Sequence, residues 1–163
     1  EKFNLAKKFN LTTINFKPEE PENTVKNLIN IVKENDVTYS PLALYFLIDN
    51  NLVKDLEEIN VLFDELISKT NLEKEIKNLN IYKKGLFNSN FVSENELLKI
   101  LNPIINSESI WKSHSLYLVA EYFYSKGEKQ KAKEFFNQIL ALPQANNEIK
   151  LASKKRLNRD LSE

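Results

Sequence analysis

The sequence predicts an all-α protein in which helical hairpins follow one another along the chain. Only two glycines and five prolines interrupt 163 residues, and the apolar residues recur at the spacing of a helix face rather than in alternation. These apolar faces also repeat: they begin at Val25, Ile59, Leu97 and Ala132, which lie 34, 38 and 35 residues apart. Such a period fits one pair of helices with its turns, which is the unit of an α-hairpin solenoid.

Each expected helix follows from a run of helically spaced apolar residues between polar turns. We expect helices over residues 2–12, 21–35, 41–53, 56–69, 72–88, 94–106, 109–126, 129–142 and 145–161. Several starts carry a side-chain cap, a capping box or a proline at the first helical position. These signals are Ser40 before Pro41, Asp55 with Glu58, Thr70 with Glu73, and Ser93 with Glu96.

Three further positions help to delimit the helices. Residues 13–20 form a linker after the first helix, and Pro103 should kink or shorten the sixth helix because it removes an amide donor. Gly127 falls in the turn between the seventh and eighth helices, where a residue past a helix end adopts positive φ at little cost. The last helix carries apolar residues on one face only, so we expect it to cap the final hairpin.

Composition excludes several classes of function. Basic and acidic residues are equal at 23 each, so no overall field attracts nucleic acid. The basic run of the last helix, Lys150, Lys154, Lys155, Arg156 and Arg159, reads first as the solvated face of a capping helix. There is no cysteine, and His114 is the only histidine, so neither a zinc site nor a thiol catalyst is expected. We expect no cofactor and no metal.

The segment SLYLVAEYFYSKGEKQKAKEFFNQILALP, residues 115–143, resembles a tetratricopeptide repeat. The residues that carry the resemblance are Ala120, Phe123, Gly127, Ala132 and Phe136. Leu116, Ile139 and Pro143 depart from the pattern, and the other copies keep the period but not the small residues. The resemblance implies a right-handed solenoid of degenerate repeats in which the first helix of each hairpin lines a concave groove. The groove residues that it implies are Lys77, Asn80, Lys84, Phe87, His114, Tyr117, Glu121 and Tyr124.

Over most of its length the chain is similar to the bacterial YfgM-like tetratricopeptide proteins. The matching segments are YSPLALYFLIDNNLVKDLEEINVLFDELI and LLKILNPIINSESIWKSHSLYLVAEYFYSKGE. The similarity implies a membrane helix before the repeats, a place on the periplasmic side of the bacterial inner membrane, and the Sec translocon or a periplasmic chaperone as partner. Because the chain contains no methionine, we expect residues 1–20 to follow a removed anchor and residues 21–163 to form the repeat domain.

The function we expect is therefore a non-enzymatic adaptor that binds a protein or peptide through its groove and assists the Sec translocon or envelope protein biogenesis. A soluble scaffold, cytoplasmic or envelope-bound, that assembles a complex or associates with itself is the alternative. A hydrolase or lyase of unusual helical fold is a third hypothesis, and it would depend on His114. We expect Trp111 to pack at a junction between hairpins, because aromatic side chains are more often buried in packing than exposed on a binding surface.

Overall fold

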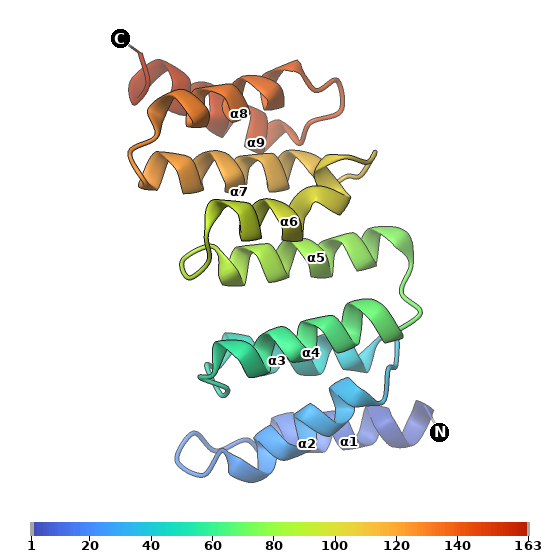
Figure 1. Ribbon diagram of the computed structural model, residues 1–163. Coiled ribbons are helices and arrows are strands. Elements are labelled where there is room, and N and C mark those ends of the chain that lie inside the picture. The colour runs from blue at the N-terminus through green and yellow to red at the C-terminus, as the bar shows by residue number, and fades with distance from the viewer. Residues whose placement is uncertain (1, 163) are drawn as a thin grey trace. The chain divides into compact units, whose positions relative to one another are not determined.

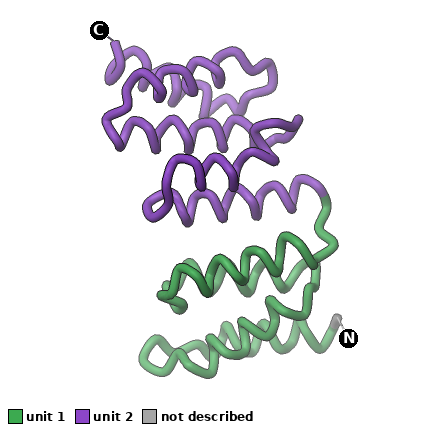
Figure 2. Tube along the Cα trace, in the orientation of Figure 1, with its two compact units in different colours: residues 1–73 green, residues 74–163 purple. Residues whose placement is uncertain are grey.

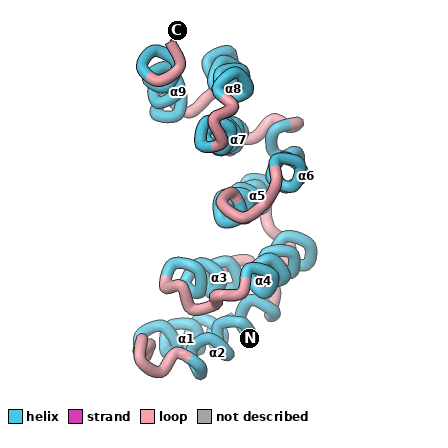
Figure 3. The backbone as a smooth tube through the Cα atoms, turned by 60° about the vertical axis from the view of Figure 1, so that its left-hand side comes forward, coloured by secondary structure: helices cyan, strands magenta, loops and turns pink. Residues whose placement is uncertain are grey.

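The computed structural model describes residues 2–162. Over this range it contains nine helices and no strand (Figures 1 and 3). The helices are α1 (Lys2–Ile14), α2 (Glu22–Lys33), α3 (Tyr39–Asp49), α4 (Leu56–Lys69), α5 (Lys74–Asn88), α6 (Glu94–Ile105), α7 (Lys112–Ser125), α8 (Lys129–Ala141) and α9 (Asn147–Arg159). The predicted all-α class is confirmed, and each helix overlaps its predicted range. No helix between residues 2 and 162 combines the length and the hydropathy that crossing a bilayer requires.

The chain divides into two compact units, coloured separately in Figure 2. Unit 1 comprises residues 1–73 and contains α1 to α4, and unit 2 comprises residues 74–163 and contains α5 to α9. In unit 1, α2 packs against α1, α3 and α4. In unit 2, α5 pairs with α6 and α7 pairs with α8; α7 also packs against both helices of the preceding pair, and α9 packs against α7 and α8.

The apolar faces that define the sequence period supply much of the core of each unit. In unit 1, α4 buries Ile59, Leu62, Phe63 and Leu66. In unit 2, α6 buries Leu97, Leu101 and Ile104, and α8 buries Ala132, Phe136 and Ile139. Removing such side chains from water is the main source of stability for a helix that is short and marginal alone.

Hydrogen bonds between neighbouring helix pairs join residues about one period apart. In unit 2 such partners lie 30 to 37 residues apart, and they include Glu75 with Ser109 and with Trp111, Ser113 with Asn146, Glu121 with Arg156, and Tyr122 with Val92. In unit 1, Thr70 and Asn35 are 35 residues apart. The same period thus governs apolar burial and polar contacts, which supports the helical-repeat character predicted from the sequence.

Two predicted helix caps are confirmed. Asp55 accepts a hydrogen bond from the backbone N–H of Glu57 at 2.8 Å, at the start of α4. Ser93 and Glu96 form the expected capping box at the start of α6. Each cap satisfies amides that the first helical turn leaves without an intrahelical partner.

The other two predicted helix starts were wrong. The third helix begins at Tyr39 instead of Pro41, because Asp36 Oδ1 accepts from the backbone N–H groups of Thr38 and Tyr39. Ser40 is buried and donates its hydroxyl to the Ile31 carbonyl at 2.8 Å. Serine therefore links α3 to α2 rather than capping a helix.

Thr70 ends α4 and does not begin α5. Its backbone is extended, and its hydroxyl donates to Asn35 Oδ1 at 3.3 Å. Asn35 follows α2 with a φ of 55°, in the left-handed region that asparagine tolerates. In the turn between α7 and α8, Gly127 has a φ of 77°, as expected from the sequence.

Candidate functional site

The predicted groove residues all lie in unit 2, on the neighbouring helices α5 and α7. Lys77 is exposed, whereas Lys84 and Phe87 of α5 are half-buried. On α7, His114, Tyr117, Glu121 and Tyr124 are all half-buried as well. The structure therefore leaves seven of the eight side chains at least partly accessible. Asn80 is the exception, since it is fully buried and donates its side-chain amide to the Ile76 carbonyl at 2.8 Å.

One side of α5 combines positive charge with aromatic surface. Lys77, Lys84 and Phe87 follow one another at spacings of seven and three residues, which places them on one face of the helix. Phe91, in the turn after α5, extends this face: its ring centroid lies 6.3 Å from that of Phe87, and 66% of its surface is exposed. We call these four residues the α5 stripe.

Trp111 fixes the junction between the pair α5/α6 and the pair α7/α8. Its indole ring stacks on Tyr82 of α5 with centroids 5.9 Å apart, and its Nε1 donates to the Glu75 carbonyl at 3.1 Å. The predicted packing role of Trp111 at a hairpin junction is therefore confirmed. A hydroxyl strengthens the same junction: Ser109 Oγ donates to Glu75 Oε2 at 2.7 Å and accepts from the backbone N–H of Trp111 at 3.1 Å.

His114 belongs to this aromatic cluster. Its ring centroid lies 5.1 Å from that of Trp111 and 5.9 Å from that of Tyr82. Burial lowers the pKa of His114 from its ordinary value, because the charged imidazolium loses hydration, while the backbone of Ile110 acts weakly in the opposite sense. The ring is thus neutral near pH 7 and packs as an aromatic side chain.

Three of the predicted groove residues are engaged by α9. Arg156 donates from Nε to Glu121 Oε1 at 2.8 Å and from Nη2 to Glu121 Oε2 at 2.7 Å. The Arg156 Cζ also lies 4.7 Å from the ring centroid of Tyr124. The pKa of Tyr117 is raised by burial and by the charge of Glu121, with Arg156 acting against both. These side chains therefore surround one guanidinium group.

The Arg156 guanidinium is also held from within α9. Its Nη1 donates to Asp160 Oδ2 at 2.8 Å, and Arg159 donates to both oxygens of Asp160. Hydrogen bonds from Arg159 and Arg156 hold the pKa of Asp160 well below its usual range. Two of the five cations in the basic run of the last helix therefore have acidic partners on the protein itself.

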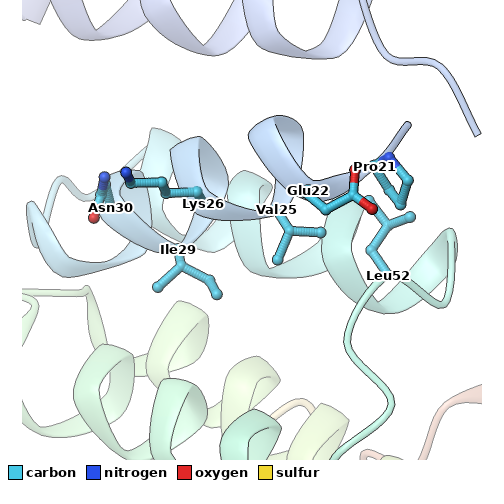
Figure 4. Close-up of a pocket in the computed structure, with 7 residues that line it drawn as sticks. All are labelled: Pro21, Glu22, Val25, Lys26, Ile29, Asn30 and Leu52. Atoms are coloured by element: carbon cyan, nitrogen blue, oxygen red, sulfur yellow. The ribbon is translucent and has the colours of Figure 1, made fainter.

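Sequence reasoning did not find a groove of about 460 Å³ in unit 1. Val25, Ile29 and Leu52 are among its apolar lining residues, and Figure 4 shows Val25 and Ile29 along α2. Pro21, Glu22, Lys26 and Asn30 complete the lining. Val25 and Ile29 are half-buried and belong to the first of the four repeated apolar faces, so that repeat was the signal available in the sequence.

Among residues 2–162, no three histidine, aspartate or glutamate side chains come together as a metal ion would require. Comparison of the chain with protein-family models, with curated proteins and with solved structures finds no match.

Proposed function

We propose that the chain is a non-enzymatic protein-interaction module that binds a protein or peptide partner along α5 in unit 2. The observation that carries this proposal is the α5 stripe, where two lysines and one phenylalanine share one side of α5 and Phe91, in the turn after the helix, lies against that phenylalanine. Helical repeats commonly present such a surface to an extended segment of another protein. The rings offer apolar contact area, and the lysines favour carboxylate groups beside it.

The chemistry of the stripe favours a peptide with apolar and acidic side chains over a nucleic acid. Phosphate recognition usually depends on several converging cations, often arginines, whereas the two lysines of the α5 stripe are separated by seven residues. His114, the residue on which an enzyme would depend, is packed against Trp111 and Tyr82. The proposal therefore assigns the α5 stripe a binding role and His114 a packing role.

We also propose a repeat family, a location and a partner for the chain. The repeat period of the proposed right-handed solenoid of degenerate tetratricopeptide repeats is supported by the separations of 30 to 37 residues between hydrogen-bonded partners of neighbouring helix pairs in unit 2. The periplasmic location, the membrane anchor and the Sec translocon or periplasmic chaperone as partner stay predictions from the sequence resemblance. An apolar segment of about 20 residues upstream in the full-length gene would support the anchor.

A scaffold that associates with itself is the second candidate, and one observation favours it. On α1, Phe3 is 83% exposed and Ile14 is 78% exposed. Exposed apolar residues that share a helix can mark an interface. Sedimentation of the chain over a range of concentrations, with the double substitution F3E/I14E as comparison, separates a self-associating scaffold from a monomeric adaptor.

The direct test of the adaptor function is site-specific photocrosslinking in the native cell. A photoreactive residue at Lys77 or Phe87 should give the same adduct, and one at Lys99, exposed on α6, should not. The substitution K84E should weaken the adduct at Phe87 at least fivefold, whereas K99E, which makes the same change in charge elsewhere in unit 2, should leave it unchanged. Adducts of equal yield at all three positions, or none at any, would refute binding at the α5 stripe.

A further inference from the structure

The contact between α7 and α9 has the geometry of an arginine-recognition site. Glu121 accepts two hydrogen bonds from Arg156, at 2.8 and 2.7 Å, and the Arg156 Cζ lies over the Tyr124 ring, 4.7 Å from its centroid. This combination selects arginine over lysine, because an ammonium group can neither form the paired bonds nor stack as a plane. The side chains of Arg156 and Glu121 are 26% and 29% exposed, so the site opens to solvent.

Helix α9, which carries Arg156, has little buried apolar surface of its own. Within the helix only Ser153 is buried, Leu151 is 55% exposed, and the buried Leu161 lies beyond its last residue. Helix α8, of the same length, buries Ala132, Phe136 and Ile139 completely. Apolar burial therefore contributes less to the attachment of α9 than to that of α8, and the polar contacts of Arg156 contribute correspondingly more.

We infer that Glu121 and Tyr124 form a binding site for an arginine on an amphipathic helix, that α9 fills this site from within the chain, and that an arginine-bearing helix of a partner protein replaces α9 there. This inference rests on the proposed protein-binding function of unit 2 and adds a second contact of stated chemistry. The partner class is a basic helix with an arginine on its apolar side, as α9 itself shows.

Tethering explains why the site is filled in the free protein. A flexibly linked segment competes at an effective concentration of about millimolar, and five residues separate α8 from α9. An external helix with the same contacts is therefore outcompeted until the attachment of α9 weakens. Substitution of Arg156 weakens it without altering the two site residues on α7.

The experiment measures binding of a fluorescent peptide of residues 146–162 to the whole chain by anisotropy. The R156E chain should bind this peptide at least tenfold more tightly than the wild-type chain does, because the carboxylate introduced on α9 is repelled by Glu121. The peptide carrying R156K should bind the R156E chain at least fivefold more weakly than the unaltered peptide. The K99E chain is the matched control for added negative charge and should behave as the wild type.

Removal of the site on α7 provides the second arm. Binding to the E121Q/R156E chain should fall back to the wild-type level. Equal binding by the wild-type and R156E chains, or equal binding of the two peptides, overturns the inference. If R156E and the milder R156A both lose more helicity by circular dichroism than α9 contains, α9 is integral to the fold and the inference is likewise overturned. This assay needs no cellular partner, so its outcome is independent of crosslinking at the α5 stripe. Either experiment can fail while the other succeeds.

Discussion

Gly85 of α5 and Leu101 of α6 approach so closely that a β-carbon on Gly85 would lie 2.6 Å from Leu101 Cδ2. Leu101 is fully buried, so its side chain has little room to move away. The glycine therefore lets two helices of one pair pack together, although it sits inside a helix where alanine is intrinsically favoured.

The effect of G85A on the free energy of unfolding should change sign when Leu101 is replaced by a smaller residue. Alanine gains about 1 kcal/mol of helix propensity, but overpacking of a core costs about 1–3 kcal/mol. We expect G85A to lower the free energy of unfolding by about 1 kcal/mol in the wild type, and to raise it by about 1 kcal/mol in an L101A background. Urea unfolding followed by circular dichroism measures both values. The same sign in the two backgrounds would mean that Leu101 is not the obstacle.

Asn51 offers a stabilising substitution in unit 1. It is exposed after α3 with a φ of 50°, a conformation that glycine adopts more readily than other residues. N51G should raise the free energy of unfolding by about 0.5 kcal/mol, and N51A should lower it by about 1 kcal/mol. Asn50 is the matched control, since its φ is −96° and N50G should bring no gain. Thermal melting of the four proteins decides whether backbone conformation is the cause.

The sequence predicted the parts of the fold that depend on local order. Apolar spacing indicated the helices, and the pair Ser93 and Glu96 indicated a capping box because both partners lie within one turn. Ser40 misled the same reasoning, since a hydroxyl that could cap a helix donates instead to Ile31, on another helix. Which of two local roles a serine takes depends on the neighbouring helix, and one sequence does not specify that neighbour.

The candidate site could be predicted only in part for the same reason. The tetratricopeptide resemblance implied that Lys84 and Phe87 share one side of α5, and two residues three positions apart within a helix do lie on the same face. Asn80 was placed beside them, but the period does not reveal how far a neighbouring helix covers that side, and Asn80 is fully buried. The pairing of Glu121 with Arg156 depends on the rotation of α9 about its axis, which its weak apolar pattern does not fix.

Trp111 should contribute to stability through both its ring and its indole nitrogen. W111F keeps a ring against Tyr82 but leaves the Glu75 carbonyl without the 3.1 Å hydrogen bond, so we expect a loss of about 1 kcal/mol in the free energy of unfolding. W111A also removes the stacked ring and should cost about 3–5 kcal/mol. Urea unfolding by circular dichroism compares them. Equal costs would indicate that the ring contact contributes nothing beyond the hydrogen bond.

His114 should make stability depend on pH below the ordinary imidazole pKa of 6.5. Burial lowers its pKa in the folded chain, so below the ordinary value of 6.5 the unfolded chain binds more protons. This contribution to stability is complete above pH 6.5 and is lost as pH falls toward the folded-state pKa. The pKa values of Glu96 and Asp160 are lowered too, but from 4.5 and 3.8, so their contributions change at more acidic pH.

Two measurements test the role of His114. Because it is the only histidine in the sequence, its signal and its titration need no separation from those of other histidines. Nuclear magnetic resonance should give one imidazole Hε1 titration with a midpoint below 6.5, the value expected for a solvated ring. The melting temperature of the wild-type chain should fall from pH 7 to pH 5, whereas that of H114Q, which cannot titrate there, should stay nearly constant. The same fall in H114Q would assign the pH dependence to another group, and a midpoint at or above 6.5 would show that hydration of the ring survives beside Trp111 and Tyr82. The cluster would then be looser than the 5.1 and 5.9 Å ring separations indicate.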